Sequence, residues 1–356
     1  MNPSPKRERL REGLHEMAIF IFLRLPYKST KKMKAVVYTE YGAPKVLKVK
    51  NIEKPTPKAN EILIKIKASS VARADAMMRT GKPYIGRLFL GLTKPKNYIT
   101  GTGLAGDIEA IGNDVTRFKI GDVVFGEMIF GLGTNAEYVC VPEDGILALK
   151  PSNISYEEAA PVCDGVLTSL SLLKDIANIQ SGQKVLIIGA SGSLGTAAVQ
   201  LAKHFGAEVT GICSGKNIAL VKSLGTDKMI DYTKTDFTKN GKTYDIIYDT
   251  VGKSSFQESK QSLTEKGAYL SPVLDFQLLL KVLWTSIFGK KKALFSATGT
   301  RKVSELRALL QDIKSLMALG KIKSVIDKVY SLEEIVEAHE YVDTGRKVGN
   351  IVIKNQ

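Results

Sequence analysis

The hydrophobic and polar positions follow a strand-like rhythm from residue 33 to about residue 155. Short segments alternate apolar and polar side chains between glycines and prolines, as in Glu61-Ile-Leu-Ile-Lys-Ile66 and Gly121-Asp-Val-Val-Phe125. Alternation with a period of two predicts strands that bury one face. Residues 33–155 are therefore expected to form a β-rich domain.

The rhythm changes at residue 156. A helical pattern runs from Tyr156 to about Ala177, and strands and helices alternate from Lys184 onward. The run Lys184-Val-Leu-Ile-Ile188 is apolar without interruption, as in a parallel strand covered on both faces. Further strands are expected at 208–213, 228–232, 244–248 and 267–270, and helices at 197–205 and 218–224. This order predicts a doubly wound α/β domain.

The two ends of the chain differ from these two blocks. The first 32 residues contain a basic cluster and a short apolar stretch, but no small-residue cleavage site of a signal peptide follows. We expect an extension there. A helix at 332–342 and a strand at 347–353 end the chain, and this strand is predicted to return to the first domain. The expected parts are the extension (1–32), the β-rich domain (33–155), the α/β domain (156–325) and the return (326–356).

Charge and cysteine content narrow the possible partners and compartments. The net charge is +15, and residues 1–34 hold nine Lys or Arg against three Glu, which accounts for +6 of it. We interpret the rest as a solvated surface that attracts anionic ligands, with a nucleic-acid partner as the open alternative. Three widely spaced cysteines, Cys140, Cys163 and Cys213, predict no disulfide framework and favour a reducing compartment, here the cytoplasm.

A glycine-rich turn joins the first α/β strand to the helix after it. Gly189-Ala-Ser-Gly192-Ser-Leu-Gly195 has the strand–turn–helix context of a dinucleotide-binding loop, with Ala190 in place of the first glycine of the usual G-x-G-x-x-G. The glycines allow a tight turn, close approach of the pyrophosphate and close packing of helix on strand, while the helix N-terminus attracts the phosphates. The cofactor-binding candidates are Gly189, Ala190, Ser191, Gly192, Ser193, Leu194 and Gly195.

The end of the second strand favours NADPH over NADH. NAD sites place an acidic residue there for the ribose 2′-hydroxyl. In this chain the strand runs into Ser214 and Lys216, which suit a 2′-phosphate, and Tyr232 follows the third strand as a cover for it. An ordinary polar turn is the alternative interpretation.

Several motifs in order give the chain a family resemblance. Val71-Ala-Arg-Ala-Asp75, Gly101-Thr-Gly-Leu-Ala-Gly106, Leu167-Thr168 and Asp249-Thr-Val-Gly252 stand in the sequence as family signatures do. Over residues 33–353 the chain resembles the medium-chain dehydrogenase/reductase superfamily in its zinc-free quinone oxidoreductase branch. The resemblance implies an α/β protein with a GroES-like β-barrel catalytic domain, an inserted Rossmann domain and a homodimer.

The resemblance also suggests residues near the nicotinamide. It implies Val251 and Asn350 as further cofactor-binding residues and Thr168 as a residue facing the nicotinamide. Arg73 is a candidate donor to a developing oxyanion, and Tyr84, one residue beyond the position where the family often has a tyrosine, is a candidate proton donor. Asp75 is expected to orient backbone rather than to exchange protons. The chain departs from the family at Ala72, where Asn or Thr is frequent, and at Gly103, where Glu is frequent, and these departures leave the catalytic details open.

The same comparison argues against catalytic zinc. The three positions where the zinc-dependent relatives carry their ligands are Ala72, Thr102 and Asp164 in this chain, and Cys163 lies one position off. Alanine has no ligand atom, and one carboxylate does not hold zinc tightly. We expect no metal site.

Without a Lewis acid, oxidation of an unactivated alcohol is difficult, whereas an electrophilic acceptor needs only hydride and hydrogen-bond donors. We therefore expect a zinc-independent, NADPH-dependent reductase of quinones or α,β-unsaturated carbonyls. An enoyl-thioester reductase is the alternative among enzymes. An NADPH-binding protein with a structural or nucleic-acid-binding role is the alternative of another class, although no RNA-binding motif supports it.

The segment 276–288 is apolar, holds the single tryptophan, Trp284, and is followed by Lys290-Lys-Lys292. Three interpretations stay open. The segment packs on the sheet or in a dimer interface, covers the acceptor as a lid, or contacts anionic lipid. Peripheral membrane contact is the least favoured of the three.

Overall fold

The computed structural model describes residues 31–96, 98–128, 133–273 and 275–355. Residues 33–356 form one compact unit, and the fold concerns this unit. The predicted extension lies outside the described residues except for its last two.

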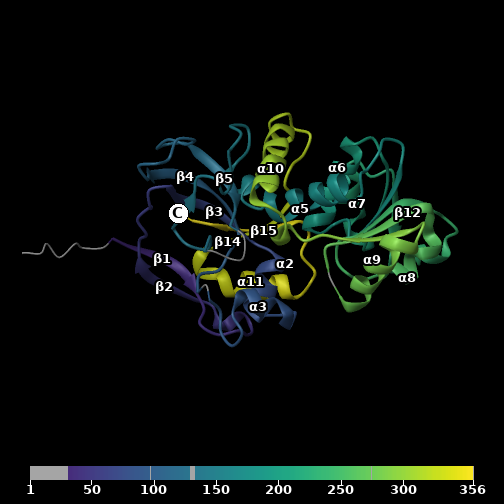
Figure 1. Ribbon diagram of the computed structural model, residues 1–356, viewed down its shortest axis with the longest axis horizontal. Coiled ribbons are helices and arrows are strands. Elements are labelled where there is room, and N and C mark those ends of the chain that lie inside the picture. Colours follow the sequence, from purple (N-terminus) through teal and green to yellow (C-terminus); the bar gives the residue numbers. More distant parts are fainter. Residues whose placement is uncertain (1–30, 97, 129–132, 274, 356) are drawn as a thin grey trace, which may run out of the picture. The chain divides into compact units, whose positions relative to one another are not determined.

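Strands and helices alternate as the sequence pattern indicates, although many ends differ by a few residues (Figure 1). The strands are β1 (Lys32–Val37), β2 (Lys48–Glu53), β3 (Glu61–Val71), β4 (Gly103–Ile111), β5 (Val123–Glu127), β6 (Tyr138–Pro142), β7 (Ile146–Leu149), β8 (Lys184–Ile188), β9 (Glu208–Cys213), β10 (Lys228–Asp231), β11 (Tyr244–Asp249), β12 (Leu263–Ser271), β13 (Lys292–Phe295), β14 (Ile326–Ser331) and β15 (Asn350–Lys354). The α-helices are α2 (Arg73–Thr80), α3 (Arg87–Leu90), α4 (Tyr156–Ala159), α5 (Thr168–Leu170), α6 (Ser193–His204), α7 (Ile218–Ser223), α8 (Phe256–Ser259), α9 (Phe276–Phe288), α10 (Val303–Ala318) and α11 (Ile335–Asp343).

The β-rich part contains a seven-stranded sheet in the order β14-β15-β3-β4-β5-β7, with β6 also paired to β3. Alternation places Ile62, Ile64 and Ile66 of β3 in one buried cluster, because every second side chain points to the same face. The last strand, β15, lies antiparallel to β3 with Ile351 opposite Val71. The C-terminal end of the chain therefore contributes β14 and β15 to this sheet, whereas β1 pairs with β2 in a separate two-stranded sheet.

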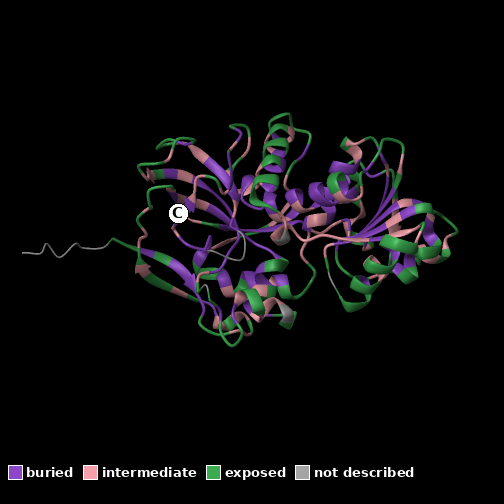
Figure 2. Ribbon diagram, viewed as in Figure 1, coloured by how far each residue is buried: buried purple, intermediate pink, exposed green. Residues whose placement is uncertain are grey.

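The second sheet has six strands in the order β10-β9-β8-β11-β12-β13, and all of its neighbouring pairs are parallel. Val185, Leu186 and Ile187 are completely buried, as expected of a central strand covered on both faces (Figure 2). The order reverses at β8, which has β9 on one side and β11 on the other. This reversal is the topological switch point at which α/β proteins bind ligands. The α/β fold predicted from the sequence is confirmed.

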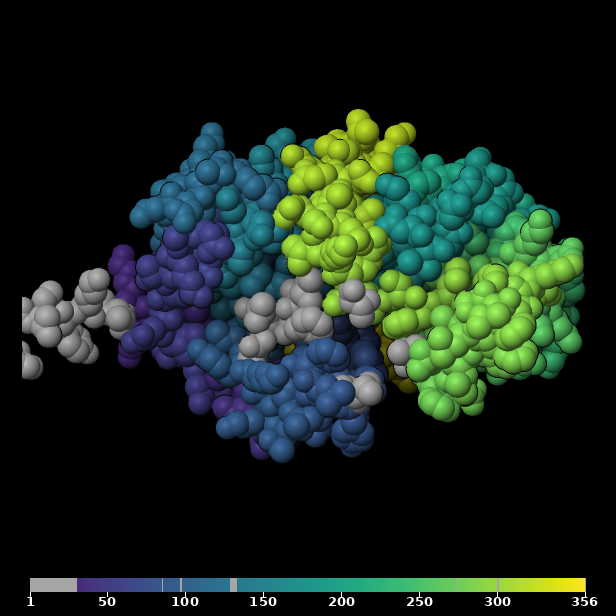
Figure 3. All heavy atoms as spheres, viewed as in Figure 1, coloured from purple at the N-terminus to yellow at the C-terminus, as the bar shows by residue number. Residues whose placement is uncertain are grey.

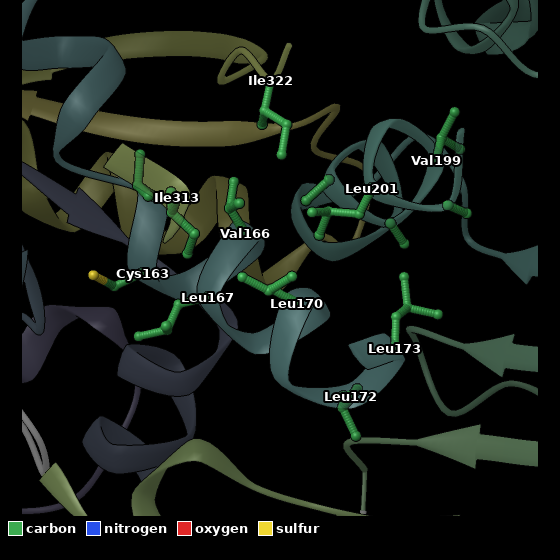
Figure 4. Close-up of a cluster of buried hydrophobic side chains, with 14 of the residues drawn as sticks. Cys163, Val166, Leu167, Leu170, Leu172, Leu173, Val199, Leu201, Ile313 and Ile322 are labelled. Atoms are coloured by element: carbon green, nitrogen blue, oxygen red, sulfur yellow. The ribbon is translucent and has the colours of Figure 1, made fainter. Parts of the chain in front are cut away.

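The helical stretch after residue 156 is less regular than its pattern predicts. Helix α4 is followed by π-helical turns at Cys163–Leu167 and Ser171–Ile176, with α5 between them. Figure 4 shows Val166, Leu167 and Leu170 in one cluster with side chains of α6 and α10. Helix α10 packs against both β7 and the 163–167 turn. The proposed boundary between the two domains at residue 155 stays a prediction.

Helix α9 is the least buried of the long helices that lie beside the six-stranded sheet. Only Leu278 and Thr285 among its 13 residues are buried. Among the described residues, no helix is long and apolar enough to cross a membrane.

Candidate cofactor and active site

A pocket of about 960 Å³ opens at the carboxyl ends of β8, β9 and β11. The glycine-rich loop after β8, the residues after β9 and β10, the loop after β11 and the segment before β15 all contribute to its walls. The candidates Gly189, Ser191, Gly192, Ser214, Lys216, Tyr232 and Val251 line this pocket. The structure thus brings seven of the predicted cofactor residues to one place.

The loop after β8 has the geometry that a phosphate site needs. Gly189 has a φ of 77°, which favours glycine, and Gly192 caps α6 in an extended conformation. A Cβ atom on Gly195 would lie 2.1 Å from the Gly189 carbonyl oxygen, so only glycine allows this approach of helix and strand. The N-terminus of the 12-residue helix α6 consequently faces the pocket with free backbone N–H groups.

Two further candidates in the loop, Ala190 and Leu194, pack beneath the turn in the protein interior. Ala190 is completely buried, and Leu194 packs against the hydrophobic cluster under α6. Neither residue lines the pocket. Their contribution is to hold the turn in position.

The segment before β15 runs across the loop. The Gly349 N–H donates to the Ser191 carbonyl oxygen at 2.8 Å. The Ser193 hydroxyl lies 2.5 Å from Asn350 Oδ1 and 2.9 Å from Asp164 Oδ2. Asn350 Nδ2 in turn donates to a backbone carbonyl at 2.9 Å. The predicted residues Ser193 and Asn350 therefore lie together, in contact with one another and with Asp164.

The loop after β11 is organised by Asp249, which is completely buried. Its Oδ1 accepts from the backbone N–H groups of Val251 and Gly252, and its Oδ2 accepts from that of Ser254. The Tyr269 hydroxyl donates to Oδ2 at 3.0 Å, and burial raises the pKa of this phenol. The carboxylate thereby holds Val251 and Ser254 at the pocket wall.

Positive charge dominates the pocket walls. Lys216, Lys253, Arg346 and Lys347 line the pocket, against Asp236 and Glu258. Serine stands at position 214, where an NAD site has an acidic residue. Such walls fit a dinucleotide that carries a 2′-phosphate, with the helix N-terminus for its pyrophosphate.

Sequence reasoning missed Arg346 and Lys347 as cofactor candidates. The structure places both in the pocket because the segment from Gly345 to Gly349 crosses the glycine-rich loop. A basic pair between two glycines, directly before the returning strand, is the signal in the sequence that marks them.

Three carboxyl groups, from α2, β5 and the 163–167 turn, lie near one another. Asp75 Oδ2 accepts from the Ala72 backbone N–H at 2.7 Å, which agrees with its expected role in orienting backbone. Burial raises the pKa of Asp75 to about 7 and that of Glu127 to about 8, and the nearby Asp164 raises both further. Among the described residues, Asp75 Oδ1 and Glu127 Oε2 have no hydrogen-bond partner.

Glu127 stands opposite Gly103 in the β4–β5 pair. A Cβ atom on Gly103 would lie 2.5 Å from both Ser70 Oγ and the Ala160 carbonyl oxygen, so no side chain fits there. Directly opposed residues in a sheet point to the same face. Glu127 therefore presents its carboxyl group on the face to which position 103 points.

Replacing Glu127 with glutamine is expected to stabilise the protein at alkaline pH. Between the ordinary value of 4.5 and the folded value of about 8, the folded chain keeps a proton that the unfolded chain has released. The free energy of unfolding of the natural chain therefore falls as pH rises through this window. The difference in the free energy of unfolding between Glu127→Gln and the natural chain should shift in favour of the variant by on the order of 2 kcal/mol from pH 5 to pH 8.

Chemical denaturation at both pH values measures this gain. Glu340→Gln, on the exposed side of α11, is the matched control and should give no such difference. An equal effect of Glu127→Gln at both pH values would show that Glu127 is ionised in the folded chain.

The positions of the family's zinc ligands do not form a metal site here. Ala72 offers only a methyl group, Thr102 is buried, and Asp164 contacts the Ser193 hydroxyl. No group of three or more His, Cys, Asp or Glu residues suited to a metal ion occurs in the described parts of the chain. Burial raises the pKa of the Cys163 thiol well above its ordinary value. The donor set present here does not fit zinc.

The three catalytic candidates are not brought together with the pocket. Thr168 is half-buried in α5, with its hydroxyl 3.5 Å from the Cys163 carbonyl oxygen. Arg73 is exposed at the start of α2. Tyr84 is 66% exposed and lies beside the Arg87 guanidinium. Their roles stay predictions.

Comparisons with known proteins agree with both halves of the fold. Residues 58–151 match the model of the alcohol dehydrogenase GroES-like domain, and residues 224–353 match that of the zinc-binding dehydrogenases. The chain is 33% identical to a 2-methylene-furan-3-one reductase of Solanum lycopersicum over 90% of this chain and 79% of that protein. It is 29% identical to an NADPH-dependent alkenal/one oxidoreductase of Arabidopsis thaliana, over 91% and 80% of the two chains.

A solved structure is similar over the same length. The quinone oxidoreductase from Coxiella burnetii superimposes with a TM-score of 0.80 and 30% identity, covering 92% of this chain and all of that one. Similarity at this level extends over both sheets.

Proposed function

Because this chain belongs to the quinone oxidoreductase branch of the medium-chain dehydrogenase/reductase superfamily, we propose that it reduces quinones or α,β-unsaturated carbonyls with NADPH, without zinc. The single observation that carries the proposal is the basic pocket at the switch point of the parallel sheet. Relatives named as reductases of an enone, an alkenal and a quinone support the choice of acceptor.

The residues of the pocket divide the work of binding. The N-terminus of α6 holds the pyrophosphate, because its first backbone N–H groups face the pocket. Ser214, Lys216 and Arg346 hold the 2′-phosphate, and Tyr232 covers it. When bound, the cofactor supplies a hydride to the acceptor. Ser193 and Asn350 fix the crossing of the C-terminal segment over the loop.

The alanine at position 72 explains why the acceptor must already be electrophilic. The position that holds a metal ligand in zinc-dependent relatives is Ala72 in this chain, so no metal polarises an alcohol there. With its pKa raised to about 8, Glu127 is largely protonated at neutral pH, and Asp75, with a pKa of about 7, is protonated in about half of the molecules. Neutral acids do not repel the negative charge that develops on an enolate or quinol oxygen.

The experiment is NADPH oxidation by the full-length protein, with phenanthrenequinone, benzoquinone, a 2-alkenal and crotonyl-CoA as acceptors. We expect turnover with a quinone or the alkenal, unchanged by EDTA, and no stoichiometric metal in elemental analysis. Preference for crotonyl-CoA would favour an enoyl-thioester reductase instead. Turnover that EDTA abolishes, or one zinc per chain, would refute the metal-free mechanism.

Compartment and assembly complete the proposal. The three cysteines are free in the structure, which fits the cytoplasm or another reducing compartment. The homodimer follows from the family resemblance and stays a prediction, which light scattering of the purified protein tests.

A further inference from the structure

The helical stretch from residue 159 to residue 173 has one polar edge. Its residues are all buried except Asp164 and Thr168, which are partly exposed. The two lie four positions apart in a helical run, so they share one face of it. Helix α10 packs against the 163–167 turn, and Figure 3 shows this helix, in yellow-green, at the molecular surface. Thr168, the residue predicted to face the nicotinamide, therefore has an acid beside it.

Asp164 lies between the cofactor pocket and two other acids. Its Oδ2 atom is 2.9 Å from the hydroxyl of Ser193, the first residue of α6. Its charge acts on Lys347, which lines the pocket, and on Asp75 and Glu127. The proposed cofactor has its 2′-phosphate end beyond β9, so its nicotinamide end extends to the other side of the α6 N-terminus. Asp164 therefore borders the space in which an acceptor would meet the nicotinamide.

The hydrogen bonds around Ser193 need one proton more than Ser193 and Asn350 supply. A backbone carbonyl only accepts, so the Asn350 amide presents its NH₂ group to the Val325 carbonyl oxygen and its Oδ1 to Ser193. The Ser193 hydroxyl has a single hydrogen, which the 2.5 Å contact with Oδ1 uses. The 2.9 Å contact between Ser193 and Asp164 is then a hydrogen bond only if Asp164 donates it. This geometry places a proton on the Asp164 carboxyl group.

Glu127 is the neighbouring acid that can replace this proton. Burial and the nearby Asp164 raise the pKa of Glu127 to about 8, so it is largely protonated at neutral pH. Its Oε2 atom is buried and has no hydrogen-bond partner in the described part of the chain. Asp75, in contrast, is held through Oδ2 by the Ala72 backbone N–H. Glu127 therefore keeps an exchangeable proton close to Asp164.

The other titratable groups around Asp164 are poorer proton donors. Lys347 Nζ donates to the Gly349 carbonyl oxygen at 2.7 Å, and burial lowers the pKa of this lysine, which disfavours its protonated form. Burial raises the pKa of the Cys163 thiol and that of the Tyr248 phenol far above their ordinary values. Groups with such high pKa values release a proton reluctantly at neutral pH.

We propose that Asp164 gives its proton to the acceptor, and that Glu127 reloads it. The inference rests on the proposed function. An α,β-unsaturated carbonyl takes the hydride of NADPH at its β-carbon, and the electron pair of its C=C bond moves toward the carbonyl oxygen. The O–H bond of Asp164 breaks, and its proton forms the new C–H bond at the α-carbon. NADP⁺, a saturated carbonyl and the Asp164 carboxylate remain, and a proton from Glu127, replaced from water, restores the acid.

The variant Asp164→Asn separates proton transfer from structure. An asparagine amide can still donate to the Ser193 hydroxyl, but it has no acidic proton to give. With NADPH and a 2-alkenal, kcat of the full-length variant should fall by about 100-fold or more. With 9,10-phenanthrenequinone it should fall by less than about fivefold, because a hydroquinone anion takes its proton from water. Fluorescence titration should give a dissociation constant for NADPH within about twofold of the natural value.

Infrared spectroscopy tests the proton on Asp164 without cofactor or acceptor. The difference spectrum between the natural chain and Asp164→Asn should contain the C=O stretching band of a protonated carboxyl group. Asp114→Asn, at an exposed acid after β4, is the matched control. It should lack this band in its own difference spectrum and reduce both acceptors as the natural chain does.

Four results would overturn the inference. They are an equal loss with both acceptors, which would show a structural role, an unchanged alkenal rate in Asp164→Asn, a natural chain that reduces the quinone alone, and a difference spectrum that shows only a carboxylate. A natural chain that reduces neither acceptor would refute the proposed function instead. The infrared band would then still decide whether Asp164 holds the proton, so the two proposals fail separately.

Discussion

The Lys216→Ala variant is expected to bind NADPH roughly 10- to 100-fold more weakly, while NADH binding changes by less than about twofold. The lysine lines the pocket at the end of β9, where no acidic residue is available for a ribose hydroxyl. A charge-assisted contact to the 2′-phosphate exists only with NADPH, so its removal affects only NADPH. Titration of cofactor fluorescence gives both dissociation constants.

Two companion variants sharpen this result. Arg346→Ala should give the same selectivity, because the structure places its side chain in the same pocket. Lys222→Ala removes an equal charge from the exposed side of α7 and should leave both constants unchanged. If Lys216→Ala weakened the two cofactors equally, the 2′-phosphate would have to be bound elsewhere.

Gly195→Ala is expected to destabilise the folded protein by about 2–4 kcal/mol and to abolish measurable NADPH binding. The added Cβ atom would meet the Gly189 carbonyl oxygen at 2.1 Å and the Ala190 Cα atom at 2.7 Å. Both are backbone atoms, so α6 must move away from β8, and the phosphate-binding N–H groups move with it. Thermal unfolding with and without NADPH measures both effects.

Gly192→Ala is the informative control for this loop. Its Cβ atom would meet only the Gly189 carbonyl oxygen, at 3.5 Å, which is an ordinary contact. The variant should therefore unfold at nearly the natural temperature, yet bind NADPH more weakly because the methyl group stands where the pyrophosphate approaches. A Gly195→Ala protein with natural stability and affinity would contradict the close packing of α6 on β8.

The sequence predicted the parts of the site whose position depends on residues close to them in the chain. The loop follows an unbroken apolar strand that ends before Gly189, and it precedes an amphipathic helix that continues after Gly195. This order predicts that the loop lies at the carboxyl edge of a parallel sheet. The residues directly after β9 must line the same edge, which is why Ser214 and Lys216 were identifiable. Family signatures extended this reasoning to Asn350, which lies against Ser193.

Contacts between distant segments decided the remainder. Arg346 and Lys347 reach the pocket only because β15 crosses to pair with β3 and draws the preceding segment over the loop. The carboxyl group of Glu127 is close to Asp164 and Asp75 only through strand register and the irregular 163–167 turn. The periodicity of apolar residues does not predict contacts between segments that lie so far apart in the chain.

Helix α9 shows the same division most clearly. Its sequence predicted a helix rich in apolar residues, and this composition left open packing in the core or a dimer interface, a lid, or, least favoured, a membrane contact. Periodicity reports how a helix partitions its own side chains, whereas exposure depends on which surfaces the rest of the chain leaves beside it. The sequence alone thus predicted the two folds and the loop, and it is the basis of the proposed 2′-phosphate site. Only the tertiary structure, by packing α9 on β13 through one narrow side, decided that its apolar face is open.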